Sequence, residues 1–130
     1  MSIYEKELYD VIRNMHGCVY YKLIIDGKSH YDEFVKELKN LPNESRSLKK
    51  VLTLMERYSP NILLPKERFR KIEGIKRSDV FEFKDRPCVR IYVVIQKENI
   101  YIVDGSLKKE QDATISRVAR LLKGFKIEEI

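Results

Sequence analysis

The sequence predicts a small α+β protein in which helices pack on one face of a twisted, antiparallel-rich sheet. Three observations lead to this fold class. The 130 residues are 43% hydrophobic and 35% charged, with only 5 Gly and 4 Pro, which excludes disordered, collagen-like and repeat proteins. Helical periodicity dominates the first half of the chain, and three short strand patterns follow one another in the second half. A chain of this length forms a single domain around one core.

Residues 3–15 are predicted to form an N-terminal helix. Apolar residues recur there at the spacing of one helix face, and Gly17 can end the helix. These apolar residues are Tyr4, Leu8, Val11, Ile12 and Met15. We expect this addition, residues 1–17, to pack against the helices that follow in the chain.

A strand and a pair of helices are predicted next. Residues 18–25 read CVYYKLII, which is β-branched and aromatic, and the turn signal Asp26-Gly27 follows. Ser29 and Asp32 resemble the start of a helix over residues 31–38, which ends near Pro42. A second helix extends from Asn43 to residue 58. The short link between the two helices predicts a helical hairpin.

The second half of the chain is predicted to form an antiparallel meander and a closing helix. Residues 63–77 hold six bases and two acids with little periodicity, which indicates an irregular basic connector or an edge segment. Strand patterns follow at residues 80–84, 89–95 and 100–103. Residues 115–122 then show helical spacing, with Gly124 as the stop signal.

The first hairpin of the meander has one apolar and one polar face. Burying its apolar residues together places Phe83 opposite Val89 and Phe81 opposite Ile91, with a five-residue loop over residues 84–88. Glu82 then lies opposite Arg90 on an exposed face, close to Lys84 and Tyr92. Two interpretations remain open. In one, the two side chains form an exposed ion pair on the solvent side of the sheet and contribute under about 1 kcal/mol to stability. In the other, they form a functional site in which the carboxylate accepts a proton and the guanidinium binds phosphate.

The positive charge lies in the second half of the chain. Residues 1–65 carry 10 bases and 9 acids, whereas residues 66–126 carry 16 bases and 9 acids. Such a basic half suits a nucleic acid, although a solvated surface or an acidic protein partner also explains it. Candidate RNA-binding residues are Lys66, Arg68, Arg70, Lys71, Lys76, Arg77 and Arg86.

Taken in order, four segments over residues 18–124 resemble the RelE/HigB-like toxins of bacterial toxin–antitoxin systems, and the HigB-like branch in particular. The segments are Phe81-Glu82-Phe83-Lys84, Val89-Arg90-Ile91-Tyr92, residues 100–103, and the pair Lys108-Lys109. The resemblance implies a RelE/ParE-like fold whose helices cover one face of the sheet and whose other face forms a groove.

The resemblance also implies an activity, namely cleavage of messenger RNA at the ribosome without a metal ion. The ribose 2′-hydroxyl attacks the adjacent phosphate, which leaves a 2′,3′-cyclic phosphate. Glu82 fits the base, and the expected cations are Arg90, Lys84, Lys108 and Lys109. Tyr92 is the available substitute for a proton donor, because residues 110–115 lack the Tyr or His that some members have there. The implied partner is a cognate antitoxin, expected to be a helix-turn-helix protein.

Other functions remain open beside this ribonuclease. One is a non-catalytic binding protein of the same fold, which is either an antitoxin-binding module or a gyrase-directed toxin. Another is a host or phage protein that binds RNA nonspecifically. The two histidines and two cysteines show no metal-ligand spacing, so we expect no metal and no cofactor. The start of the chain reads as neither a signal peptide nor a membrane span, which favours a cytoplasmic location without a membrane partner.

Overall fold

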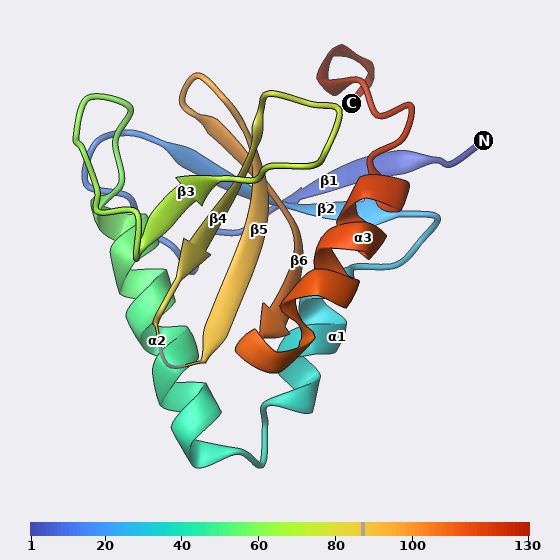
Figure 1. The fold of residues 1–130 in the computed structure, drawn as a ribbon. Coiled ribbons are helices and arrows are strands. Elements are labelled where there is room, and N and C mark those ends of the chain that lie inside the picture. Colours follow the sequence, from blue (N-terminus) through green and yellow to red (C-terminus); the bar gives the residue numbers. More distant parts are fainter. Residues whose placement is uncertain (87) are drawn as a thin grey trace.

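A mixed six-stranded sheet forms the centre of the computed structural model, which describes residues 1–86 and 88–130 (Figure 1). The strands are β1 (Tyr4–Leu8), β2 (Val19–Ile25), β3 (Phe69–Lys71), β4 (Val80–Lys84), β5 (Val89–Gln96) and β6 (Asn99–Leu107). Their spatial order is β1-β2-β6-β5-β4-β3. β2 and β6 run parallel, and the other neighbouring pairs run antiparallel. The predicted α+β class with an antiparallel-rich sheet is confirmed.

Two helices, α1 (His30–Glu37) and α2 (Pro42–Arg57), follow one another through a short link as predicted and cover one face of the sheet, where α1 packs mainly on β6 and α2 on β5. The Ser29 hydroxyl caps α1 by accepting a hydrogen bond from the Asp32 amide at 3.1 Å. The apolar sides of both helices pack on the strands in a first core. This core includes Tyr31, Phe34, Val51, Met55, Phe83, Ile91 and Ile102. No helix among the described residues has both the length and the apolar composition needed to cross a membrane.

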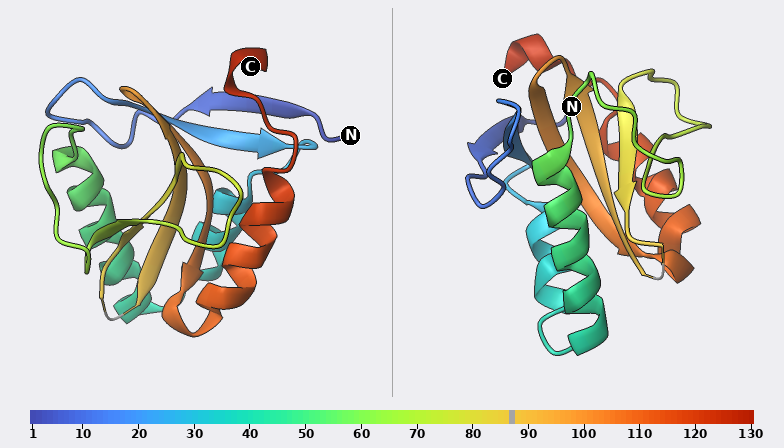
Figure 2. Two further views of the ribbon diagram at one scale, coloured as in Figure 1. Left: turned by 45° about the horizontal axis from the view of Figure 1, so that its top comes forward. Right: turned by 90° about the vertical axis from the view of Figure 1, so that its left-hand side faces the viewer.

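A third helix, α3 (Gln111–Leu121), packs on the opposite face, so the prediction that all helices share one face is wrong. The short 3-10 turns η1 (Lys108–Glu110) and η2 (Ile127–Glu129) flank it in the sequence. The right-hand view of Figure 2 shows the sheet between the pair α1 and α2 on one side and α3 on the other. This second face also carries apolar side chains, and a helix packed on them removes them from water. Val118, Leu122 and Phe125 pack there against Val94, Tyr101 and Val103 in a second core.

The N-terminal segment is a strand followed by a loop, so the predicted helix over residues 3–15 is wrong. β1 pairs with β2 from Tyr4 opposite Ile25 to Leu8 opposite Tyr21. Of the apolar residues at helical spacing, Leu8, Val11 and Met15 are exposed. Tyr4 and Leu8 are four residues apart, which also suits one face of a strand, and pairing along the otherwise open edge of β2 satisfies the backbone groups of the segment.

The β4–β5 hairpin keeps the predicted faces in a register that differs from the predicted one by two residues. Glu82 lies opposite Tyr92, and Lys84 lies opposite Arg90. The predicted pairs Glu82–Arg90, Phe83–Val89 and Phe81–Ile91 are therefore wrong. A shift of two residues leaves every side chain on its original face, so burial of the apolar side does not distinguish the two registers.

The turn of this hairpin explains the register. Residues 85–89 lie between the last pair, Lys84 and Arg90, so the turn has the predicted length but begins one residue later. The Asp85 amide donates to the Val89 carbonyl at 3.0 Å, and the Asp85 carboxylate accepts a bond from the Ser47 hydroxyl of α2 at 2.8 Å. These contacts fix the point at which β4 ends. Pro87, which the sequence also places in the turn, lies outside the described residues.

Part of the basic connector forms the edge strand β3. Its three residues pair antiparallel with β4, and Arg70 lies directly opposite Glu82. The edge-segment interpretation of residues 63–77 therefore holds for residues 69–71.

Gly105 of β6 lies against Phe34 of α1, and this close approach yields a first prediction. A Cβ atom at position 105 would lie 2.3 Å from Cδ2 and 2.7 Å from Cε2 of Phe34. In Gly105→Ala the ring must move, and overpacking of this kind costs about 1–3 kcal/mol. Urea titration should show the free energy of unfolding lowered by that amount.

The double variant Gly105→Ala/Phe34→Leu is the control, because it removes the obstructing ring. It should lose less stability than the two single variants lose together. Strictly additive losses would show that contact with Phe34 is not the cause.

Candidate functional site

Polar side chains from four strands and from α3 meet on the face of the sheet opposite α1 and α2. Side chains alternate along β4, so Phe81 and Phe83 belong to the first core while Glu82 and Lys84 project from the other face. Glu82 bonds to residues of β3 and α3, and the strand register places the polar residues of β5 and β6 beside these two. We call the whole set the polar cluster. Its members are Arg70, Glu82, Lys84, Arg90, Tyr92, Asp104, Ser106, Gln111 and Arg117.

The Glu82 carboxylate is the centre of the polar cluster. Its Oε1 lies 3.0 Å from Nε of Arg70 and 3.8 Å from Nζ of Lys84. Its Oε2 accepts a hydrogen bond from Nε2 of Gln111 at 3.0 Å. Glu82 is 0% exposed, so the charge is held by these three partners and not by bulk water.

The polar face of the hairpin is covered, although the sequence predicts an exposed face. Tyr92 is 0% exposed and Arg90 is 4% exposed, like the buried Glu82. The first turn of α3, which carries Gln111, lies over this part of the sheet. The interpretation of Glu82 and Arg90 as a solvated cross-strand pair is wrong for the same reason.

Burial lowers the pKa of Lys84, and the positive charges of Arg70 and Arg90 lower it further against the opposing effect of Glu82. Its ammonium group therefore releases a proton more readily than that of an ordinary lysine. A carboxylate and a more acidic ammonium group thus lie within 4 Å of each other, at 3.8 Å between Oε1 and Nζ. Such a pair can accept one proton and donate another.

Tyr92 is held in its neutral form. Its hydroxyl lies 2.9 Å from the Ser106 hydroxyl, and burial raises the pKa of the phenol above its ordinary value. A neutral phenol is a hydrogen-bond donor and not a base. Tyr92 can therefore contribute a donor to the polar cluster.

The Arg90 guanidinium has an unused hydrogen-bonding group. Its Nη1 donates to the Asp85 carbonyl at 2.9 Å. Within residues 1–86 and 88–130, its Nε is the one buried side-chain nitrogen or oxygen with no hydrogen-bond partner. A buried donor without a partner is costly to maintain. An anion placed beside Arg90 would satisfy it.

A second buried carboxylate fastens α3 to the sheet. Asp104 of β6 is 0% exposed, and its two oxygens accept bonds from Arg117 Nε at 2.7 Å and Nη2 at 3.0 Å. Its Oδ1 also accepts the Gly105 amide at 2.8 Å. The bidentate geometry is the strong form of such a pair. Arg117 thus holds α3 over the polar cluster.

Lys108 and Lys109 lie in η1, outside the polar cluster. Both are exposed, and with Cys88 and Glu44 they line a shallow hollow beside the start of α2. Among the described residues, no hydrogen bond or ion pair joins either ammonium group to Glu82. The structure does not bring this predicted pair into contact with Glu82.

The predicted RNA-binding residues occupy different environments. Lys66, Arg68, Lys71, Lys76 and Arg86 are exposed, and Arg70 is engaged with Glu82. Arg77 has a structural role: it pairs with Asp79 at 2.9 Å, and its Nη1 donates to the Phe125 carbonyl at 2.7 Å. Arg77 therefore ties the chain after α3 to the β3–β4 loop.

Four members of the polar cluster are not predicted from the sequence, which indicates only a general RNA-binding role for Arg70. The missed residues are Asp104, Ser106, Gln111 and Arg117. One signal was present, because Asp104 follows the apolar run Ile100 to Val103, where a carboxylate needs a partner. No such signal marks Gln111, since its role depends on where α3 docks.

No group of three or more His, Cys, Asp or Glu residues suited to a metal ion occurs in the described parts of the chain. Cys18 is buried and Cys88 is half-buried, and both are free thiols.

Comparison of the chain with protein-family models, curated proteins and solved structures found no match.

The Asp104–Arg117 pair yields a second prediction. Arg117→Ala removes two bonds to a buried carboxylate, and hydrogen bonds to charged groups contribute about 1.5–3 kcal/mol. We expect a loss of stability of this size, together with faster hydrogen exchange in α3. Arg120→Ala is the matched control, because Arg120 is an exposed arginine on the same helix. Equal effects in the two variants would contradict a specific role for Arg117.

Proposed function

We propose that this chain is the toxin of a bacterial toxin–antitoxin pair and that it cleaves messenger RNA at the ribosome without a metal ion. One observation carries the proposal. The buried carboxylate of Glu82 shares a cluster with the cations Arg70 and Lys84 and with Arg90, whose Nε has no partner. Attack by a 2′-hydroxyl needs a base and needs cations around the phosphorus. The polar cluster contains both.

The arrangement of layers supports the RelE/HigB-like assignment. The resemblance implies helices on one face of the sheet and functional residues on the other. α1 and α2 cover one face, and Glu82, Lys84, Arg90 and Tyr92 belong to the other. The position of α3 over the polar cluster is an additional feature of this chain.

In the proposed reaction Glu82 takes the proton of the 2′-hydroxyl, and the 2′-oxygen forms a bond to the adjacent phosphorus. The bond from phosphorus to the 5′-oxygen breaks, and Lys84 gives that oxygen a proton. The products are a 2′,3′-cyclic phosphate and a 5′-hydroxyl. Arg90 and Arg70 stabilise the charge on the phosphoryl oxygens. Exposed bases such as Lys108 and Lys109 bind neighbouring phosphates.

Access to Glu82 requires movement of α3. Because Glu82 is fully buried and bonded to Gln111, no 2′-hydroxyl reaches it until that bond opens. This observation also favours a second candidate function, in which the chain is a non-catalytic binding protein of the same fold. A gyrase-directed toxin belongs to this second class.

Expression of the chain alone in a bacterium separates these functions. A ribonuclease toxin arrests growth and depletes messenger RNA. A gyrase-directed toxin gives double-strand DNA breaks with intact transcripts, and a silent module allows normal growth.

The proposed partner is an antitoxin that covers the basic surface. A short helix-turn-helix protein encoded in the adjacent reading frame would be the candidate.

Variants of Glu82 and Arg90 test the chemistry. Glu82→Gln keeps the shape of the side chain and removes the base, so cleavage of ribosome-bound messenger should fall by about 10²–10⁴-fold while RNA binding persists. Arg90→Ala removes a phosphate contact, so both binding and rate should fall, the rate by about 10²–10³-fold. Thermal melting first establishes that each variant is folded.

Glu98→Gln is the control for this test, because Glu98 is an exposed carboxylate in the β5–β6 turn at the far end of the same sheet. Its activity should equal that of the wild type. Full activity in folded Glu82→Gln and Arg90→Ala would overturn the assignment of the site.

The lowered pKa of Lys84 predicts a pH dependence. The ammonium group donates a proton only below its pKa, so the rate should decline as pH rises through that value. Because burial lowers the pKa, the decline should begin below the ordinary lysine value of 10.5. Lys84→Arg carries a group that stays protonated, so its slower reaction should lack this decline. An unchanged pH profile in Lys84→Arg would exclude Lys84 as the proton donor.

A further inference from the structure

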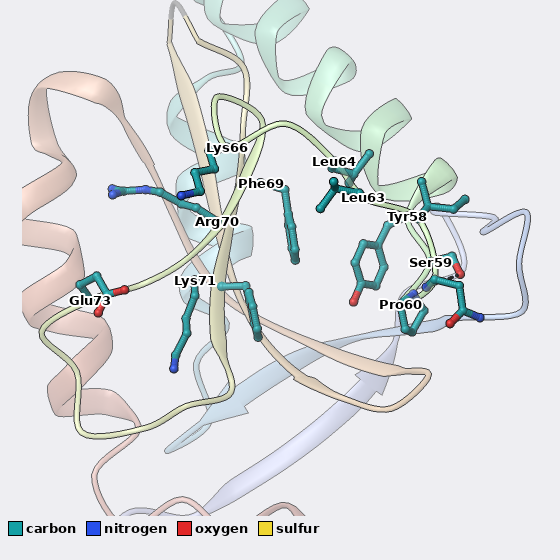
Figure 3. Close-up of a pocket in the computed structure, with 13 residues that line it drawn as sticks. Tyr58, Ser59, Pro60, Leu63, Leu64, Lys66, Phe69, Arg70, Lys71 and Glu73 are labelled. Atoms are coloured by element: carbon teal, nitrogen blue, oxygen red, sulfur yellow. Dashed lines mark hydrogen bonds between the residues drawn. The ribbon is translucent and has the colours of Figure 1, made fainter.

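A separate cavity of about 750 Å³ lies at the edge of the sheet, between β3 and the loop after α2. Figure 3 shows this space, with Tyr58, Phe69 and Leu63 around it. It lies on the face of α1 and α2, because Tyr58, Phe69 and Phe81 all pack with the first core. The volume is within the roughly 300–1,000 Å³ of small-molecule sites. No residue of the cavity except Arg70 belongs to the polar cluster.

Aromatic rings form the floor of the cavity. Phe69 and Phe81 stack with their centroids 5.2 Å apart and their planes 3° from parallel. Tyr58 lies 5.1 Å from Phe69 in a tilted arrangement. Phe69 and Phe81 are both half-buried and both line the cavity, so part of each ring remains open to it.

Cations surround these rings. Lys66, Arg70 and Lys71 line the cavity, against one acid, Glu73. Further bases lie next to the cavity residues in the sequence, because Arg57 and Arg68, which directly precede Tyr58 and Phe69, line a smaller hollow together with Lys49 and Lys50. Aromatic platforms set in a basic groove are the combination by which proteins bind single-stranded nucleic acid.

We propose that this cavity binds one unpaired base of a single-stranded RNA, stacked on the Phe69–Phe81 pair, with Lys71 and Lys66 on its phosphates. The proposal rests on the proposed function, because it gives the ribonuclease a second contact with its substrate. β3 is the edge of the sheet, and Arg70 both lines the cavity and pairs with Glu82 on the other face. A strand that passes over β3 can therefore contact both places.

The experiment measures RNA affinity apart from cleavage. The full chain carries Glu82→Gln, and the probe is a labelled oligouridylate of about eight nucleotides. Phe81→Leu keeps an apolar side chain and removes the stacking ring, so it should weaken binding at least about fivefold. Tyr21→Leu is the matched control, since Tyr21 is a half-buried ring stacked on Tyr101, remote from the cavity. It should leave the affinity unchanged.

Three further measurements identify the base as the group bound. An abasic oligomer of the same length should bind Phe81→Leu and the Phe81 parent equally. The slope of log affinity against log salt should be unchanged in Phe81→Leu and should fall by about one in Lys71→Ala. Photocrosslinking of an oligomer that contains 5-iodouridine should label the peptide with Phe69 or Phe81 in the parent chain, which does not depend on the folding of a variant.

The outcomes separate this proposal from the proposed function. If the wild-type chain cleaves RNA but crosslinks occur only at the polar cluster, the cavity is not a base site. Its exposed Leu63 and Ile62 would then indicate that a protein segment docks there. If Phe81→Leu loses as much affinity for the abasic oligomer as for the oligouridylate, the base assignment is also overturned. If the wild-type chain does not cleave RNA and the Glu82→Gln parent does not bind it, the proposed function fails together with this one.

Discussion

The Glu82 carboxylate lies fully inside the protein, and the arrangement around it follows from the need to compensate its charge. Moving an unpaired carboxylate out of water costs several kcal/mol, so each partner is required where it stands. Arg70 reaches Glu82 from the edge strand, and Gln111 reaches it from the start of α3. The same charge therefore joins β3 to β4 and brings α3 onto the sheet. Packing and the proposed chemistry depend on one set of contacts.

The two faces of the sheet differ in the way they are covered. One face is apolar and carries α1 and α2. The other is apolar at one end of its strands, where Val80, Val94 and Tyr101 lie side by side, and polar at the end near the β4–β5 turn, and α3 extends over both parts. Val118 packs on the apolar part, while Gln111 and Arg117 bond to carboxylates on the polar part. Gln111 thus holds the first turn of α3 at the proposed site by a polar contact, whereas the later turns combine the Arg117–Asp104 pair with hydrophobic contacts.

The elements that local sequence determines could be predicted, and those that depend on distant partners could not. The strand at residues 18–25, the capped helix after Ser29 and the meander have clear periodicity and turn signals, and all are present. The spacing of Tyr4 and Leu8 is compatible with one face of a helix and with one face of a strand, and pairing along the open edge of β2 decides between them. The hairpin register depends on the bond from Ser47 to Asp85, which joins residues 38 positions apart. The burial of Glu82 likewise depends on where α3 docks, which its own sequence does not specify.

The parallel pairing of β2 with β6 has a consequence for synthesis of the protein. It joins Val19 to Asn99, so β2 gains its inner neighbour only after all the residues between β2 and β6 have been made. Until then the apolar sides of α1 and α2 have no complete sheet to pack on. Contacts between residues so distant in sequence slow folding. The nascent chain therefore leaves the ribosome with an exposed helical hairpin, and folding and the polar cluster are completed together, after translation has passed β6.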